Sequence, residues 1–146
     1  MTAEKQIKIL VAEDEAMMSE IVVRKLSSSG FDVQAAYDGR QALELWLNEK
    51  PDIVLLDLIM PEMDGFEVLK NIRKNKDAKI AETPVIILSN LWSNKDILKA
   101  QDLKIQGYLV KAYFTTEEIL NKVKDVLAQK GNWPIVILHW HAIAWW

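Results

Sequence analysis

The feature of this sequence that most constrains its fold is a regular alternation of short apolar runs with longer amphipathic runs. The short runs are rich in branched residues and are bounded by polar or turn-forming residues, which is typical of β-strands. The longer runs carry apolar residues three or four positions apart, which indicates helices with one buried face. The predicted strands lie at residues 7–12, 31–36, 53–56, 85–88 and 107–110, and a helix is predicted after each of them.

Five strand–helix units in succession predict a parallel sheet, because consecutive parallel strands need a crossover and a helix usually supplies it. The run Ile-Val-Leu-Leu at 53–56 is apolar throughout, as expected of a strand covered on both faces. Right-handed crossovers then favour a doubly wound sheet. We therefore predict an α/β, flavodoxin-like (βα)5 fold with strand order 2-1-3-4-5 over residues 1–130.

Capping residues mark the ends of several predicted helices. Thr115 with Glu118, and Ser93 with Asp96, have the spacing of a capping box ahead of an apolar helical run. Gly30 follows the first predicted helix, where a glycine often ends a helix. These residues support the order and the approximate limits of the elements.

Composition agrees with a folded domain and excludes several kinds of site. Half of the 146 residues are apolar and 27% are charged, which suits one domain with a packed core. The formal net charge of −3 gives no electrostatic reason to expect nucleic-acid binding, and the lack of cysteine excludes disulfides and thiolate metal sites. Residues 1–8 hold two lysines and no long apolar run, so we expect no signal peptide and a cytoplasmic location.

The composition changes abruptly at Gly131. Every Lys, Arg, Asp and Glu precedes this residue, and residues 131–146 are almost wholly apolar but too short to span a membrane. We predict that this apolar extension is buried, either as an edge strand at 135–140 beside the fifth strand or in a homodimer contact. Its origin could also be engineered or accidental. His139 and His141 would share a face of such a strand, but two histidines without a third ligand are weak grounds for a metal site.

Chemically active residues stand where the predicted strands end. Glu13 and Asp14 follow the first strand, Asp57 the third, Ser89 the fourth and Lys111 the fifth. In a doubly wound sheet ligands bind at the carboxyl ends of the strands, so we expect three carboxylates to converge there. Clustered carboxylates repel one another unless a cation neutralises them, and Mg²⁺ prefers such oxygen ligands. With the ammonium and the hydroxyl, these residues form a candidate site for a phosphoryl group.

With these residues in place, the chain resembles the receiver domains of bacterial two-component response regulators, of the CheY-like kind. The resemblance covers residues 5 to 129. Each motif is weak alone, but the order of five motifs along four strand ends makes the signal strong. The motifs are Glu13-Asp14, Leu-Leu-Asp-Leu-Ile-Met-Pro at 55–61, Asp64-Gly65, Ser89-Asn90 and Gly-Tyr-Leu-Val-Lys at 107–111.

The resemblance implies a role for each residue of the site. Mg²⁺ would be held by Glu13, Asp14, Asp57 and the backbone carbonyl of Ile59. Asp57 would be the phosphoacceptor, receiving a phosphoryl group from a histidine kinase or a phosphotransfer protein. A carboxylate can act as the nucleophile in such a transfer, which depends mainly on positioning and charge neutralisation.

The remaining roles concern the response to phosphorylation. By resemblance, Ser89 and Lys111 bind the phosphoryl oxygens, and Tyr108 is the aromatic switch residue that turns inward as Ser89 moves. The expected function is therefore a signalling module that acts through an unidentified protein target. It would not be an enzyme beyond accepting the phosphoryl group and losing it slowly.

Two departures from the family pattern carry their own predictions. The family usually has a proline after the lysine, in a cis peptide bond, where this chain has Ala112. A non-proline cis bond costs about 3 kcal/mol, so the bond is either strained or trans. Ile59 and Leu91 are apolar where many relatives carry polar residues that help water attack the phosphate, so we expect slow self-dephosphorylation.

Two other functions were weighed against the signalling module. A phosphatase of the haloacid-dehalogenase-like kind would place an aspartyl nucleophile after the first strand with a second Asp two residues on. This chain instead has Glu13-Asp14 there and a lone Asp57 after the third strand, which argues against that enzyme. The alternative is a receiver-derived scaffold or assembly module in which the apolar extension mediates oligomerisation.

Overall fold

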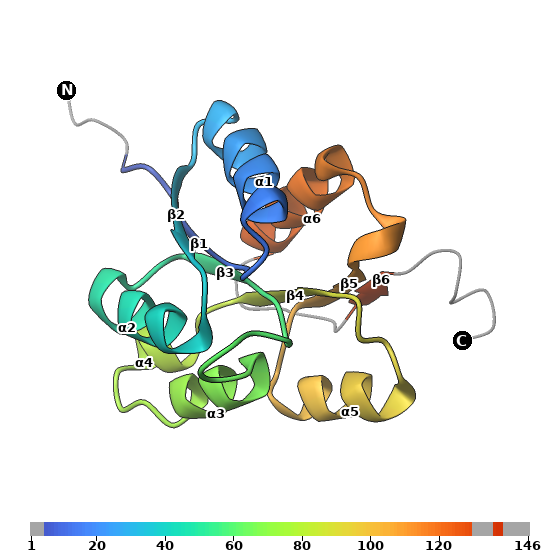
Figure 1. Cartoon of the computed structure of the whole chain (residues 1–146). Coiled ribbons are helices and arrows are strands. Elements are labelled where there is room, and N and C mark those ends of the chain that lie inside the picture. Colours follow the sequence, from blue (N-terminus) through green and yellow to red (C-terminus); the bar gives the residue numbers. More distant parts are fainter. Residues whose placement is uncertain (1–4, 130–135, 139–146) are drawn as a thin grey trace.

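The structure, a computed structural model, describes residues 5–129 and 136–138. Its strands are β1 (Lys8–Ala12), β2 (Asp32–Ala36), β3 (Ile53–Leu56), β4 (Val85–Ser89), β5 (Gly107–Val110) and β6 (Val136–Leu138). Its helices are α1 (Ala16–Ser28), α2 (Gly39–Glu49), α3 (Gly65–Arg73), α4 (Ala78–Ala81), α5 (Asn94–Asp102) and α6 (Thr116–Ala128), with a 3₁₀ turn at Lys111–Tyr113. Figure 1 shows the strands forming one layer with helices above and below it.

The strands form one parallel sheet in the order β2-β1-β3-β4-β5-β6. The order 2-1-3-4-5 predicted for the first five strands is confirmed. β6 pairs with β5, with Val136 opposite Gly107 and Leu138 opposite Leu109. An edge strand therefore lies where one was predicted for 135–140. The other residues of the apolar extension, including Gly131 and both histidines, lie outside the described residues.

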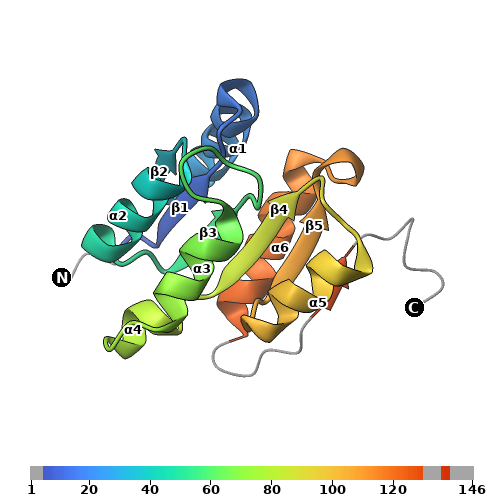
Figure 2. The same cartoon turned by 60° about the horizontal axis from the view of Figure 1, so that its bottom comes forward.

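Two apolar cores cover the two faces of the sheet, because successive strand residues point to opposite sides. In β3, Val54 and Leu56 belong to one core, and Ile53 and Leu55 to the other. The first core is closed by α2, α3 and α5, and the second by α1 and α6. The turned view in Figure 2 brings α3 and α5 forward, over the strands. This confirms the doubly wound arrangement.

Most predicted boundaries hold, and one helix was missed. Thr115 forms the predicted capping box with Glu118. Ser93 caps α5, and Gly30, with φ of 97°, follows the end of α1. The four-residue helix α4 was not predicted, because it is too short to show a helical period; its cap, Asp77, is its only local signal. No helix in the described part of the chain is long and apolar enough to cross a bilayer.

Backbone hydrogen bonds continue beyond the strands and fix the loops that follow them. The Glu13 N–H donates to the Ala36 carbonyl at 2.9 Å, and the Asp57 N–H donates to the Ala12 carbonyl at 3.0 Å. The residues that follow β1 and β3 are therefore held by the sheet itself. This gives the acidic side chains at this edge a rigid support.

A single arginine ties the opposite side of the domain together. The Arg73 guanidinium, at the end of α3, donates to four backbone carbonyls at 2.8 to 3.1 Å. Two of these carbonyls precede β4 and two follow α5. Burial lowers the pKa of Arg73 to about 10, so the group stays charged at neutral pH. Nothing in the sequence near Arg73 indicates this role.

Candidate functional site

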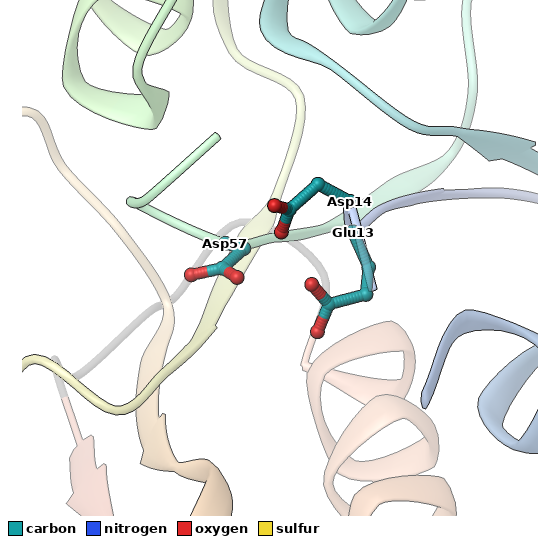
Figure 3. A group of neighbouring side chains, drawn as sticks. All are labelled: Glu13, Asp14 and Asp57. Atoms are coloured by element: carbon teal, nitrogen blue, oxygen red, sulfur yellow. The ribbon is translucent and has the colours of Figure 1, made fainter. Parts of the chain in front are cut away.

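Three carboxylates meet at the carboxyl edge of the sheet. Glu13 and Asp14 follow β1, and Asp57 follows β3, its neighbour in the sheet. One carboxylate oxygen from each lies within 4.8 Å of the others, and Figure 3 shows the three groups gathered there. Glu13 and Asp57 are only 3% and 4% exposed, whereas Asp14 is exposed. The convergence predicted from the sequence is therefore observed.

Lys111 supplies the positive charge of this cluster. Its ammonium lies 2.7 Å from Asp57 Oδ2 and also contacts Glu13 Oε1. The Lys111 side chain is itself 11% exposed, so these ion pairs are shielded from solvent. One ammonium offsets one of three carboxylates, which leaves a net negative charge at the edge of the sheet.

Burial and neighbouring charges have different net effects on the pKa values of Glu13 and Lys111. Burial raises the pKa of the Glu13 carboxyl to about 7; the nearby charge of Asp57 adds to this effect, and the contact with Lys111 opposes it. Burial alone would lower the pKa of Lys111, but its hydrogen bonds and ion pairs with Asp57 and Glu13 outweigh this and raise it. Lys111 therefore stays charged at neutral pH, while Glu13 binds a proton readily when no other cation is present.

Both oxygens of Asp57 have a donor. Oδ2 accepts from Lys111, and Oδ1 accepts from the backbone N–H of Ile59 at 3.2 Å. Ile59 thus contributes to the site through its backbone, while its side chain is 54% exposed. These two bonds hold the Asp57 carboxylate in one orientation. Little conformational entropy is therefore lost when a ligand binds to it.

Ser89 and Tyr108 lie beside this cluster and contact the same residue. The Ser89 hydroxyl oxygen accepts from the Leu91 N–H at 3.3 Å, and the Tyr108 hydroxyl donates to the Leu91 carbonyl. Both side chains are fully buried, and burial raises the pKa of the Tyr108 phenol. The loop after β4 is therefore held by two of the residues that the sequence singled out.

Ala112, which stands where the family usually has proline, makes a backbone hydrogen bond that was not predicted from the sequence. No peptide bond among the described residues is cis, so Lys111–Ala112 is trans. The Ala112 N–H donates to Asn90 Oδ1 at 3.2 Å, a bond that a proline cannot make. Asn90 therefore links the loop after β4 to the turn that carries Lys111. The only signal for Asn90 was its place beside Ser89.

Exposed apolar side chains follow all five strands at this edge. One large apolar side chain that is between 42% and 75% exposed follows each of β1 to β5, either in the loop after the strand or in the first turn of the structure that comes next. They are Met17, Tyr37, Ile59, Trp92 and Tyr113. We call this set the apolar rim.

The donor set fits a hard divalent cation. All three carboxylates offer oxygen, and Mg²⁺ usually binds through one or two carboxylates together with waters and phosphate oxygens. The single ammonium leaves negative charge for such a cation to neutralise. Soft metals prefer sulfur ligands, and the chain has no cysteine.

Comparison with known proteins agrees with this geometry. The family model described as the response regulator receiver domain matches residues 9–124. The chain is 38% identical over 120 residues to a probable transcriptional regulator, ycf27, of Porphyridium aerugineum, covering 82% of this chain and 48% of the relative. The corresponding protein of Guillardia theta is 36% identical over 129 residues. The chain thus spans about half the length of these curated relatives.

Solved structures give the same result. The receiver domain of the Francisella response regulator 1452 is 31% identical, with a TM-score of 0.76 over 85% of this chain and 98% of that chain. The chemotaxis response regulator CheY4 of Vibrio cholerae is 29% identical, with a TM-score of 0.75 over 84% of this chain and 99% of that chain. The sheet order, the acidic edge and the match over residues 9–124 lead to one conclusion: the chain belongs to the family of response regulator receiver domains.

Proposed function

We propose that this chain is a phosphorylation-dependent signalling module that accepts a phosphoryl group on Asp57. Receiver domains interact with histidine kinases or phosphotransfer proteins and are mainly signalling modules rather than enzymes. The donor proposed here is therefore a phosphohistidine on a protein of either kind. A cytoplasmic location remains a prediction.

The observation that carries the proposal is the environment of Asp57. Its carboxylate is 4% exposed, accepts from Lys111 and from the Ile59 N–H, and lies within 4.8 Å of two further carboxylates. A structural aspartate would be satisfied by Lys111 alone. The extra carboxylates add repulsion that only a cation relieves, and such cost is typical of a functional site.

The chemistry assigned to the site is a single displacement at phosphorus. An oxygen of Asp57 forms a bond to phosphorus while the phosphorus–nitrogen bond of the donor breaks, and the imidazole leaves with the electron pair. In this proposal Lys111, which already contacts Asp57, neutralises charge on the transferred group, and Ser89 donates its hydroxyl hydrogen to it. The product is an acyl phosphate on Asp57.

Receiver domains generally bind Mg²⁺ at an acidic pocket. Here Glu13, Asp14 and Asp57, with the Ile59 carbonyl, would hold the ion. When bound, it neutralises the carboxylates and the incoming phosphoryl oxygens.

Phosphorylation would be sensed through Leu91. A phosphoryl group on Asp57 would draw the Ser89 hydroxyl toward it, and the Leu91 N–H, which donates to the Ser89 oxygen, would either follow the hydroxyl or lose this bond. Tyr108 is already buried without a phosphoryl group, so the inward turn predicted for it does not apply to this structure; the change proposed here is in its bond to the Leu91 carbonyl, which would move with the loop. This gives Tyr108 its proposed switch role.

The apolar rim supports a protein donor, because exposed apolar side chains that follow the same strand ends as Asp57 offer a surface for another protein to contact. Serine substitution of Met17 or Tyr37 should slow transfer from a phosphorylated donor protein and leave transfer from acetyl phosphate unchanged. The scaffold alternative and the homodimer through the apolar extension remain predictions, and size measurement of the intact chain against a version ending at Lys130 tests them.

The test of the proposed function is intact-mass measurement after incubation with MgCl₂ and acetyl phosphate. The parent should gain one phosphoryl group, Asp57→Asn none, and the exposed control Asp102→Asn one. If the folded parent gains nothing, the proposal fails. Equal labelling of the parent and Asp57→Asn would show that the acceptor lies elsewhere. Turnover of a generic phosphate ester would instead favour an enzyme.

A further inference from the structure

Gly39 makes an unusually close approach to the loop that follows Asp57. It is the first residue of α2 and is buried. Its N–H donates to the Pro61 carbonyl at 3.2 Å. A Cβ atom added to Gly39 would lie 1.7 Å from the carbonyl oxygen of Met63 and 2.5 Å from the Met63 carbonyl carbon.

Space, rather than backbone conformation, requires the glycine at this position. Gly39 does not have a positive φ, so an alanine could adopt its backbone angles. The atoms it would meet are backbone atoms, which cannot move aside as a flexible side chain does. The separation of 1.7 Å is half of the 3.4 Å at which ordinary contact begins, so α2 and the loop would have to separate by more than one ångström.

Gly30 is the opposite kind of glycine and provides a matched control. Its φ is 97°, a conformation that favours glycine, yet a Cβ atom there would meet nothing within 4 Å. Gly30 ends α1 at the other edge of the sheet from the acidic site. Alanine at Gly30 therefore strains the backbone without displacing the loop after Asp57.

The loop that Gly39 contacts carries a proposed cation ligand. Its two ends are fixed, because the Ile59 N–H binds Asp57 Oδ1 and the Gly65 N–H donates to the Leu58 carbonyl at 3.0 Å. Between these ends the Pro61 carbonyl accepts from the Gly39 N–H, and the Met63 carbonyl lies close against the Gly39 backbone. The path of the segment from Ile59 to Met63 is thus set from a different strand–helix unit.

We propose that Gly39 is a positioning residue for divalent-cation binding. Because Gly39 has no side chain, the loop after Asp57 can lie against its backbone, and this packing places the Ile59 carbonyl at the acidic site. The proposal rests on the proposed function, since it concerns the same cation. Mg²⁺ requires near-ideal octahedral geometry at about 2.0–2.1 Å, so a ligand displaced by an ångström is lost. Residues that orient a metal ligand typically change affinity about 10- to 100-fold when they are altered.

The test compares Gly39→Ala with Gly30→Ala by calorimetric titration with MgCl₂, with stability measured in urea. We expect Gly39→Ala to bind Mg²⁺ at least about 10-fold more weakly, and Gly30→Ala to bind it as the parent does, although both lose stability. Phosphorylation of Gly39→Ala by acetyl phosphate should need correspondingly more Mg²⁺ and recover at saturating Mg²⁺. A purely structural role would not produce this recovery.

Two results would overturn the positioning role. One is a folded Gly39→Ala protein with the affinity of the parent, and the other is equal weakening in both variants. If Gly39→Ala does not fold, the test becomes an NMR titration of the ¹⁵N-labelled parent with MgCl₂, in which the signal of the Gly39 amide is followed. That amide should shift on Mg²⁺ addition with the same midpoint as the Ile59 amide, and an unshifted Gly39 amide counts against the role. A parent that binds no Mg²⁺ would instead overturn the proposed function.

Discussion

Neutralising Glu13 should stabilise this protein when no divalent cation is present. Glu13 is 3% exposed and shares Lys111 with Asp57. Its pKa rises from an ordinary 4.5 to about 7 on folding, chiefly through burial. The substitution Glu13→Gln keeps the shape of the protonated side chain and removes its ionisation.

The sign of the stability difference follows from the pKa of Glu13 in the unfolded and in the folded protein. Because the folded-state pKa is the higher one, the stability contributed by protonated Glu13 is fully present below pH 4.5 and is lost as the pH rises through about 7. Each pKa unit corresponds to about 1.36 kcal/mol, so the full loss is roughly 3 kcal/mol. Glu13→Gln avoids this loss. We therefore expect the variant to exceed the parent by roughly 3 kcal/mol at pH 8 and to equal it at pH 4.5.

Urea unfolding in EDTA at several pH values measures this difference directly. The exposed neighbour Glu15 provides the control, and Glu15→Gln should stay within about 0.5 kcal/mol of the parent at every pH. Added Mg²⁺ should stabilise the parent more than Glu13→Gln, since it compensates the charge of Glu13. A pH-independent difference in EDTA, or a less stable Glu13→Gln at pH 8, would show that folding does not raise the pKa of Glu13.

Three further predictions concern other parts of the domain. Ile59→Asn should shorten the half-life of the phosphorylated protein about ten-fold, because a polar group beside Asp57 can orient an attacking water; an unchanged half-life would contradict this. Arg73→Met should lower the free energy of unfolding by at least about 3 kcal/mol, since it leaves four carbonyls without their donor, whereas Arg24→Met, at an exposed pair, should cost under about 1 kcal/mol. Equal costs would show that the Arg73 contacts contribute little. Trp46 in α2 is fully buried, and its indole N–H donates to the Thr83 hydroxyl oxygen at 3.1 Å. Trp46→Phe should cost about 2–3 kcal/mol by urea unfolding, because it opens space in the core and removes this hydrogen bond; a cost under about 0.5 kcal/mol would argue against that contact.

Much of the fold follows from patterns that act over a few residues. Strand 53–56 was predicted with its observed limits because both of its faces are buried, so every residue in it is apolar. The meeting of Glu13, Asp57 and Lys111 was predictable because parallel strands end at one edge. Their positions in the sequence therefore determine their positions in space.

The parts that the sequence did not reveal depend on contacts between distant segments. Arg73 looks like any arginine at the end of a helix, and its carbonyl partners are brought to it only by the packing of two loops. Gly39 looks like an ordinary turn glycine, and its need for space appears only when the loop after Asp57 lies against it. The bond between Asn90 and Ala112 likewise joins two separate loops.

Chemical identification of the phosphorylated residue decides whether Asp57 is the phosphoacceptor. The protein is incubated with MgCl₂ and acetyl phosphate, reduced with borohydride, digested and mapped by mass spectrometry. Borohydride reduces an acyl phosphate to an alcohol, so an aspartyl phosphate becomes homoserine. If Asp57 is the phosphoacceptor, homoserine should appear at position 57 and at the position of no other aspartate, and it should not form without Mg²⁺. Homoserine at a different position, or a phosphoryl adduct that resists borohydride, would contradict it.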